Sequence, residues 1–451
     1  MEKYGSIDKG LLLLDHMDDK AVLLYESFKK AGFEGVTLVV EDDGFIPDDV
    51  VGLYRYFIKK GNPTIQPRFF NQIDSEDYWV ITANNQSGEI SDMGILKGRI
   101  NYTKRYKDEK RIVSSVDWLD EKSIVRATDY YDIYGELYSR SSYDSNGKML
   151  IRTYYDEEFR EIIVCNFITG DIILNEGDLV HIFHEKVEFI AYLIDKIAKV
   201  QDTSIRKIYY NSLGTPLLYT LRVSADSSLI WQEGLREELP GNMKYILDGK
   251  SNTKRIYVQD LKALEHFKTL TDKQEMFEGL GYLFSFIRNN MYRREVFIFT
   301  NSDQIVGLTE LVQNYPELNF HIAAVTEMSS KLLSFSKYQN VRLYPCISDD
   351  MKEKLFQKCD IYLDINRGDE LLNTIHRAFL ENMLILALDE TKHNADYISK
   401  EHSFESIESL MQTLSKVIAD SDEMDRELEL QRKNAMLCSP VTYRNMITYF
   451  I

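Results

Sequence analysis

Apolar and polar residues alternate along this chain with two different periodicities. The first part of the chain combines short apolar runs with a helical periodicity. A short apolar run at residues 11–14 precedes a helical pattern that Gly32 ends, and a second apolar run follows at 36–40. Four residues share one face of that helix: Ala21, Leu24, Phe28 and Ala31. Strand, helix and strand in this order predict the beginning of an open parallel α/β sheet.

Helical periodicity disappears between about residues 64 and 187, where β-branched and aromatic runs alternate with polar turns. An aspartate recurs every twelve residues, at Asp108, Asp120, Asp132, Asp144 and Asp156. One strand and one turn fit this period, which predicts an antiparallel meander. The pair Asn146-Gly147 predicts a hairpin turn of type I′, in which both residues need a positive φ.

The side-chain alternation in this segment predicts one face open to water. Ile112, Val116 and Trp118 fall on one face, and Val113, Ser115 and Asp117 on the other. The aspartate repeat, in which Tyr131, Tyr143 and Tyr155 directly precede three of the aspartates, has two interpretations. It is turn chemistry with cross-strand aromatic packing, or it is an exposed aromatic surface that binds a partner. The candidate interface residues are Trp118, Tyr130, Tyr131, Tyr143, Tyr154 and Tyr155.

After residue 188 the α/β pattern returns, and from 295 strands and helices alternate five times. A helix is expected over 370–382, with Leu371, Leu372, Ile375, Ala378 and Phe379 as its core stripe. The prediction is an α/β fold with two Rossmann-like domains and an antiparallel β-meander domain inserted in the first. The first domain covers 1–63 and 188–290, the insertion 64–187, the second domain 291–440, and a C-terminal helix 441–451. The ligand site is expected between the two halves, at the carboxyl ends of the strands.

Composition narrows the class of protein further. With 451 residues and 44% hydrophobic content the chain can fill two or three domains. Its net charge of −18 repels phosphate backbones, so nucleic acid is not an expected partner. Four scattered cysteines favour a reducing compartment, and no apolar run is long enough to span a membrane. His181 and His184 lack further ligands nearby, so neither a metal nor another cofactor is predicted.

Polar residues gather directly after the buried strand at 295–300, where side chains at a sheet's carboxyl edge can meet a ligand. The candidate ligand-binding residues are Asn301, Ser302, Asp303, Gln304, Arg367, Arg377 and Asn242. Other interpretations stay open for some of them. Ser302 or Asp303 can cap a helix, Asn242 can belong to a structural turn, and Arg377 can be a surface helix residue without a ligand.

The second half resembles the donor domain of retaining glycosyltransferases of the GT-B type. In that family an arginine and a lysine in the first loop hold the donor's diphosphate, and two glutamates eight positions apart hold its sugar and ribose. Aligned on Gly307, this chain has Asn301 and Val306 at the two basic positions. Asp369 can replace the first glutamate, but Arg377 stands at the second, where a guanidinium donates hydrogen bonds and accepts none. The resemblance therefore implies a glycosyltransferase scaffold without donor chemistry.

A narrower resemblance runs through nearly the whole chain. Segments such as DDGFIPDD (42–49), VDWLD (116–120), TGDIIL (169–174), NSDQIVGL (301–308) and YLDINRG (362–368) carry it by their order and spacing. They resemble the stabilising, non-catalytic GtfB-type subunit of the two-subunit peptide O-GlcNAc transferase of bacterial accessory Sec systems. This likeness implies a cytoplasmic co-activator, in some members at the inner face of the cell membrane.

The same resemblance implies two partners. One is a catalytic subunit that transfers GlcNAc from UDP-GlcNAc to serine and threonine, joined through the inserted β-domain. The other is the acceptor, a serine-rich repeat adhesin polypeptide, bare or partly glycosylated. The alternatives are an active retaining glycosyltransferase with a divergent nucleotide-sugar site and a free-standing peptide-binding scaffold. The donor-loop positions favour the non-catalytic subunit.

Overall fold

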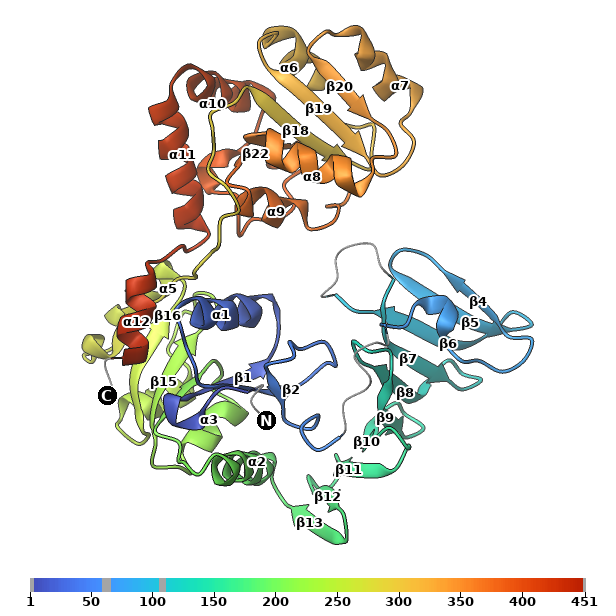
Figure 1. Ribbon diagram of the computed structural model, residues 1–451, viewed down its shortest axis with the longest axis vertical. Coiled ribbons are helices and arrows are strands. Elements are labelled where there is room, and N and C mark those ends of the chain that lie inside the picture. The colour runs from blue at the N-terminus through green and yellow to red at the C-terminus, as the bar shows by residue number, and fades with distance from the viewer. Residues whose placement is uncertain (1–3, 59–65, 105–110, 449–451) are drawn as a thin grey trace. The chain divides into compact units, whose positions relative to one another are not determined.

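The computed structural model describes residues 4–58, 66–104 and 111–448. Asp108 of the aspartate repeat lies outside the described residues. The chain forms two compact units, residues 1–281 with 440–451 and residues 282–439 (Figure 1). Tyr282, Arg288 and Asn290 thus belong to the second unit, although they precede the predicted boundary at 291. Each of the two units is built around a parallel sheet.

The first unit contains a seven-stranded parallel sheet, and the apolar runs at 11–14 and 36–40 form two of its strands, as predicted. Its spatial order is β17 (Phe277–Gly279), β16 (Thr253–Val258), β15 (Asp226–Trp231), β14 (Lys207–Tyr210), β1 (Leu11–His16), β2 (Val36–Glu41) and β3 (Val51–Gly52). Its helices are α1 (Asp19–Lys30), α2 (Lys186–Val200), α3 (Thr215–Thr220), α4 (Gly241–Leu247), α5 (Leu261–Thr269) and α12 (Pro440–Thr448). Short 3-10 turns cover Ile7–Lys9 and Gln274–Met276.

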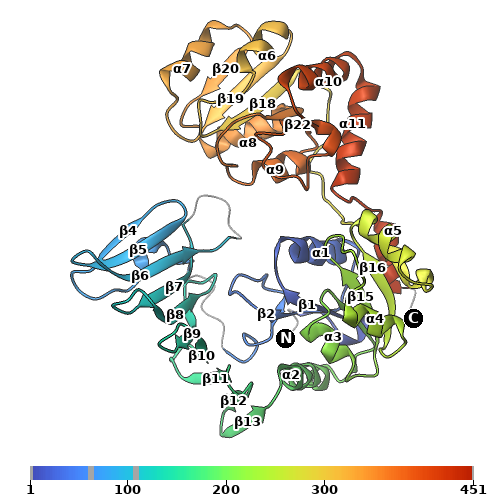
Figure 2. The ribbon, with the colours of Figure 1, turned by 180° about the vertical axis from the view of Figure 1, so that it is seen from behind.

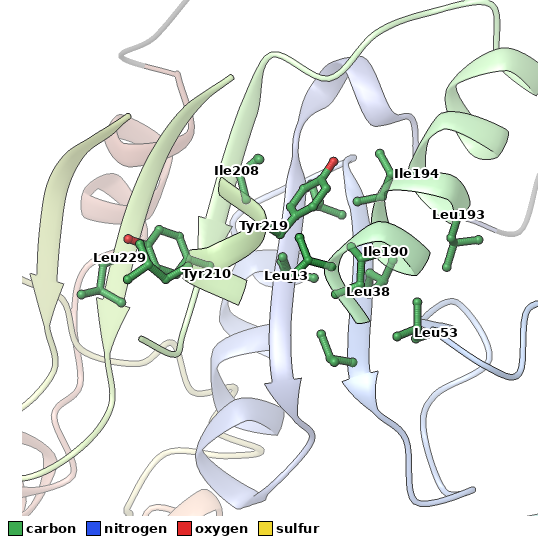
Figure 3. Packing of buried hydrophobic residues seen from close by; sticks show 14 of the residues in the cluster. Leu13, Leu38, Leu53, Ile190, Leu193, Ile194, Ile208, Tyr210, Tyr219 and Leu229 are labelled. Carbon is green, nitrogen blue, oxygen red and sulfur yellow. The ribbon is translucent and has the colours of Figure 1, made fainter. Parts of the chain in front are cut away.

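The core of this sheet forms where α2 covers β1 and β2. Ile190, Leu193 and Ile194 on one face of α2 are buried in the same cluster as Leu13 and Leu38 (Figure 3). Complete burial of one such aliphatic side chain contributes roughly 1.5–3 kcal/mol. The helical spacing of the apolar residues in α2 therefore fixes which face of the helix meets the sheet.

The inserted domain is a ten-stranded antiparallel sheet in which spatial order follows chain order, so the predicted meander is confirmed (Figure 2). A 3-10 turn, Phe70–Gln72, precedes it. The strands are β4 (Val80–Ala83), β5 (Ser87–Asp92), β6 (Ile95–Tyr102), β7 (Val113–Leu119), β8 (Val125–Tyr131), β9 (Leu137–Tyr143), β10 (Met149–Tyr155), β11 (Glu161–Asn166), β12 (Ile172–Glu176) and β13 (Leu179–Phe183).

The aspartate repeat builds four equivalent turns of this meander. In each turn the aspartate Oδ1 accepts hydrogen bonds from the backbone N–H groups two and four residues further on, a local capping of the chain by its own side chain. The aspartates are Asp120, Asp132, Asp144 and Asp156. Turn chemistry therefore explains the twelve-residue period.

The predicted type I′ turn at Asn146-Gly147 is wrong in its detail. Gly147 has a φ of 78°, but Asn146 is not among the residues with positive φ. The corresponding residues of the other three turns also have positive φ, namely Ser123, Gly135 and Phe159. A single left-handed residue near the end of the turn is typical of longer hairpin loops with a bulge. The four-residue span of the aspartate's hydrogen bonds requires this longer loop.

The second unit contains a six-stranded parallel sheet. Its spatial order is β20 (Val341–Tyr344), β19 (Asn319–Ala324), β18 (Glu295–Thr300), β21 (Ile361–Asp364), β22 (Leu384–Leu388) and β23 (Ser403–Phe404). Its helices are α6 (Leu308–Asn314), α7 (Ser330–Leu333), α8 (Asp349–Lys358), α9 (Thr374–Leu380), α10 (Ile407–Ala419) and α11 (Ser421–Asn434), and 3-10 turns cover Ser334–Lys337 and Lys400–His402.

Alternate residues of each central strand pack on opposite faces of this sheet. Val296 and Ile298 lie in one cluster with residues of α6, α10 and α11, while Phe297 and Phe299 lie in another with residues of α8 and α9. Helices on both faces of a parallel sheet are the doubly wound arrangement that the sequence predicted. None of the helices in the described part of the chain combines the length and the apolar character that crossing a membrane requires.

Candidate functional site

The candidate site of the second unit lies where the strand order of its sheet reverses. β18 and β21 are neighbours there, and their connections leave in opposite directions. Thr300, the last residue of β18, has its Oγ1 2.9 Å from Oδ1 of Asn366, which follows β21. The backbone N–H of Arg367 donates to the carbonyl of Gln304 at 3.0 Å. The two loops that carry the predicted residues are thus joined at the sheet's carboxyl edge, the usual ligand position in such folds.

Three of the predicted residues meet at this point. Asn301, Gln304 and Arg367 are exposed on the two joined loops. Gly368 approaches Asn301 so closely that a Cβ there would lie 1.7 Å from Asn301 Oδ1, so a side chain at residue 368 would displace the Asn301 amide from its present position. Arg367 donates to Glu390 Oε2 at 2.6 Å. The three side chains form a polar rim that can hydrogen-bond a ligand.

A surface pocket of about 450 Å³ adjoins this rim. Its lining residues are Asn366, Arg367, Gly368, Glu390, Thr391, Lys392 and His393. The pocket combines amide, hydroxyl, imidazole and charged groups and has no aliphatic hydrophobic side chain in its lining, which suits a hydrophilic ligand better than an apolar one.

His393 lines this pocket and hydrogen-bonds two other segments of the chain. Its Nδ1 lies 2.6 Å from Asp364 Oδ1, and its Nε2 lies 2.5 Å from the carbonyl oxygen of Gly368. The hydrogen bond to the Asp364 carboxylate raises the pKa of His393 to about 9. The imidazolium therefore joins the end of β21 to the loop that carries Arg367 at neutral pH.

This linkage predicts a pH-dependent loss of order in the pocket. Because the pKa of His393 rises from 6.5 to about 9 on folding, its contribution is complete below pH 6.5 and is lost as the pH rises through 9. We expect the second unit to lose about 2 kcal/mol over that range. Hydrogen exchange of the 364–368 amides, measured across this range, should accelerate with pH beyond the intrinsic rate. A His393→Gln variant should show no such excess, and an equal excess in both proteins would contradict the assignment.

Ser302 and Asp303 do not cap a helix, which was one of the interpretations left open for them. Neither caps α6, because Gly307, with a φ of 69°, precedes that helix and no side chain caps it. Ser302 Oγ accepts the Gln304 N–H at 3.1 Å, and Asp303 accepts a hydrogen bond from Ser329, the N-cap of α7. The capping interpretation is therefore wrong, and both residues shape the loop that presents Asn301 and Gln304.

Arg377 does not join the rim. Its Nη2 lies 2.7 Å from Glu353 and 2.8 Å from Glu381, a carboxylate that is fully buried. The guanidinium also stands over the ring of Phe356. Arg377 therefore connects α9 to α8, which is a structural explanation for an arginine at a position where the resembled enzymes have a glutamate.

The helix that carries Arg377 is shorter than predicted. It begins at Thr374 and not near 370, because Leu372 and Asn373 both have a φ of 52°. Ile375, Ala378 and Phe379 are buried as the core stripe predicted, whereas Leu371 and Leu372 are only half-buried. Val306, at the other expected basic position, packs against the apolar core.

Asn242 lies in the first unit, in the first turn of α4. Its Nδ2 donates to the carbonyl of Leu213 at 2.9 Å, in the loop that follows β14. Asn242 is therefore helical and does not belong to the predicted turn, and its side chain joins α4 to that loop. The side chain is exposed and lies beside the carboxyl edge of the first sheet.

The predicted aromatic surface of the meander is partly internal. Tyr131 and Tyr154 are each 4% exposed, and Tyr154 stacks on Tyr54 of the first domain at 4.5 Å. Trp118 donates to Asp129, Tyr130 accepts from Arg152, and Tyr143 pairs with Thr128. Tyr155 is half-buried near Phe159. Burial therefore accounts for both tyrosines, since Tyr131 packs in the meander's own core and Tyr154 in the core that the meander shares with the first domain.

The meander's exposed apolar residues are others, which the sequence interpretation missed. On the edge strand β13, Leu179, Val180 and Ile182 are 62%, 63% and 58% exposed. At the opposite end Tyr78 and Met93 are 95% and 99% exposed. The run LVHIF contained the signal, since an apolar edge strand without a cover is a template for association.

Comparison with protein families matches most of the chain. The N-terminal, middle and third domains of GtfB match residues 11–57, 79–184 and 186–270, and the GftB/GlyA-F C-terminal domain matches 296–431. The boundaries of the middle-domain match agree with the inserted meander.

Individual proteins match over nearly their whole length. The UDP-N-acetylglucosamine–peptide N-acetylglucosaminyltransferase stabilizing proteins GtfB of Streptococcus gordonii and Streptococcus agalactiae are each 37% identical, covering 94% and 92% of this chain and 95% of each relative. A chain in the crystal structure of a GtfA/B complex bound to UDP and GlcNAc is 35% identical, with a TM-score of 0.88. The match covers 97% of this chain and 99% of that one.

Proposed function

Because the chain belongs to the family of GtfB stabilising proteins, we propose that it is the non-catalytic subunit of a peptide O-GlcNAc transferase. It stabilises a catalytic partner of the kind called GtfA and binds the acceptor polypeptide, a serine-rich repeat adhesin. It acts on the cytoplasmic side, with peripheral association at the inner face of the membrane. The likeness to a chain of the GtfA/B complex supports the partnership.

One observation carries the non-catalytic part of the proposal. The positions at which the resembled enzymes bind a nucleotide sugar hold Asn301, Val306 and Arg377. Val306 packs against apolar core, and Arg377 is held by two glutamates. Val306 cannot supply the positive charge that a diphosphate needs, and Arg377 cannot supply the pair of hydrogen-bond acceptors that a ribose needs.

The decisive experiment measures transfer of radiolabelled GlcNAc from UDP-GlcNAc to a serine-rich peptide. The chain alone should transfer nothing above background, and the chain with its catalytic partner should transfer more than the partner alone. Transfer by this chain alone would instead establish an active glycosyltransferase with a divergent donor site.

We propose that the acceptor binds at the rim of the second unit, which Asn301, Gln304 and Arg367 form. Replacing Asn301, Gln304 and Arg367 together by alanine removes two amides and one guanidinium that can reach a ligand. At about 1 kcal/mol for each hydrogen bond lost, affinity for a serine-rich peptide should fall by about 10- to 100-fold. Titration of a fluorescent peptide into the full chain measures this.

A matched control removes the same three side-chain types elsewhere on the second unit. Gln313, Asn314 and Arg342 are exposed on α6 and β20, so their joint replacement by alanine should leave peptide affinity unchanged. If both triple variants bound peptide as the wild type does, the acceptor would lie elsewhere on the molecule.

We propose that the inserted meander docks the catalytic partner, with β13 as the contact strand. Lysine at residues 179, 180 and 182 would put three charges on exposed positions, which leaves the fold intact but opposes burial against a partner. We expect co-purification with the catalytic subunit to be lost. The control is lysine at Leu218 and Leu261, which are 49% and 50% exposed outside the meander. A β13 variant that still co-purified would exclude this strand as the contact.

A further inference from the structure

The two parallel sheets share one architectural feature. The strand order of the second sheet reverses between β18 and β21, and that of the first reverses between β1 and β14. In each sheet an asparagine shortly after one strand reaches the neighbouring strand. Asn366 contacts Thr300 in the second unit, and Asn211 Oδ1 accepts the backbone N–H of Asp15 at 2.9 Å in the first. Such reversal points are where open α/β sheets bind ligands.

In the first unit this contact begins a row of amide side chains. Asn211, Gln232 and Gln259 are each the first residue after a strand, following β14, β15 and β16. Asn211 Nδ2 donates to Gln232 Oε1 at 2.9 Å, and Gln232 Nε2 donates to Gln259 Oε1 at 3.0 Å. We call these three residues the amide row. Their mutual hydrogen bonds hold them in one orientation along the sheet's carboxyl edge.

The groups around the amide row determine which of its hydrogen-bonding atoms a ligand can use. Gln232 Nε2 also donates to the carbonyl of Lys20, and Lys20 Nζ donates to the carbonyl of Gln232, so this reciprocal pair holds Gln232 against the start of α1. Asn211 is half-buried, and among the described residues its Nδ2 donates to Gln232 alone, which leaves one of its two N–H bonds for a ligand. Asp15 lies beside the row with an exposed His16.

This chemistry selects a neutral ligand. Amide groups donate and accept hydrogen bonds without charge, so they match hydroxyl and amide groups and offer no compensation for a phosphate. A pre-aligned row also reduces the ordering cost of binding. Peptide backbone, serine hydroxyls and N-acetylated sugars all present such groups.

We propose that the Asn211–Gln232 part of the amide row is a second acceptor subsite, which binds neutral hydroxyl and amide groups of the acceptor chain, while Gln259, which is 3% exposed, holds Gln232 in position. This inference rests on the proposed acceptor-binding function and extends it to the first unit. Two sources share the chemistry, namely the serine-rich peptide itself and GlcNAc groups already attached to it. Asn242, whose side chain contacts the loop after Asn211, lies next to the same edge.

The test obstructs the row without cutting its hydrogen bonds. Gly234 is exposed two residues after Gln232, and a Cβ added there meets no described atom within 4 Å. A Gly234→Trp variant of the full chain should fold normally and lose about tenfold in affinity for the acceptor. Ser204→Trp is the matched control, because Ser204 is exposed in the loop that enters β14 at the opposite edge of the sheet. A Gln232→Leu variant, checked for folding by circular dichroism, gives a second reading.

Three probes separate the possible sources: a bare serine-rich peptide, the same peptide carrying GlcNAc, and free GlcNAc. Loss for both peptides indicates recognition of the chain, and loss confined to the two GlcNAc-bearing probes indicates recognition of the sugar. If Gly234→Trp and Gln232→Leu both bound every probe as the wild type does, the subsite would be refuted. If the rim triple variant alone lost binding, the proposed function would stand without this subsite. If the wild-type chain bound none of the probes, the acceptor-binding function itself would fail.

Discussion

Replacing Arg55 by alanine should destabilise the first unit by about 3–5 kcal/mol, because it leaves two buried carboxylates without a counter-charge. Arg55 is 6% exposed. Its Nη2 lies 3.1 Å from Asp132 in a meander turn, its Nε lies 3.6 Å from Asp42 after β2, and its Nη1 donates to the carbonyl of Gly44. The arginine thus joins the inserted domain to the parallel sheet.

The pH dependence of this variant identifies the mechanism. Burial raises the pKa of Asp42 and Asp132 above the ordinary value, and Arg55 partly opposes that rise. Without Arg55 both pKa values should rise further, so the folded variant takes up protons that the unfolded chain does not hold. The stability deficit should therefore shrink as the pH is lowered from about 8 to about 5.

Tryptophan fluorescence in urea measures this effect selectively. The three tryptophans are Trp79, Trp118 and Trp231, all in the first unit. Arg206→Ala is the control, since Arg206 is exposed and forms no ion pair among the described residues. An Arg55→Ala midpoint equal to the control's, at every pH, would show that the cluster contributes nothing.

Local patterns predicted the elements of this fold well, for a physical reason. A strand buried on both faces must be apolar throughout, so EVFIFT and LILAL indicate central parallel strands by themselves. The aspartate period predicted the meander because each aspartate satisfies amides within four residues of itself. Information of this kind lies within one turn or one strand of the chain.

Side-chain partners from distant segments could not be predicted in this way. Arg377 pairs with Glu353 on another helix. The start of α9 depends on Leu372 and Asn373, which have positive φ although neither is a glycine. Asn211 reaches Asp15 across 196 residues of sequence. The sequence does show a polar residue after each of the strands β14, β15 and β16, yet only the sheet order reveals that they touch.

The two parts of the candidate site differ in the same way. Asn301 and Gln304 were identifiable because they follow a strand whose end is plain from its apolar run. The pocket beside them depends on His393, which becomes part of the site only through its hydrogen bonds to Asp364 and Gly368. A lone histidine in the stretch TKHNAD gives no such indication.

Asp360 is the corresponding anchor of the second unit, and its replacement by asparagine should cost about 3–5 kcal/mol. Its fully buried carboxylate accepts hydrogen bonds from Arg288 at 2.5 Å and from Arg293 Nε and Nη2 at 3.0 and 2.9 Å. The backbone N–H groups of Met291 and Arg293 donate to it as well. An asparagine of the same shape keeps one acceptor oxygen, turns an N–H group toward these donors and leaves two arginines without their shared charge.

Two readouts distinguish this effect from a general loss of stability. Burial alone would raise the pKa of Asp360, but the hydrogen bonds from Arg293 and Arg288 outweigh it and hold that pKa below its ordinary value. The wild-type contribution is therefore present above about pH 4 and is lost as the pH falls through the folded pKa, and Asp360→Asn should lack this acid-dependent part. Hydrogen exchange in β18 and β21 should accelerate in the variant at neutral pH. The first unit, whose unfolding tryptophan fluorescence reports, should unfold at the same urea concentration as in the wild type. Asp396→Asn, at an exposed carboxylate of the same unit, should change neither measurement. Unaltered exchange in β18 and β21 of Asp360→Asn would show that the two arginines hold the segment before β18 without their shared carboxylate.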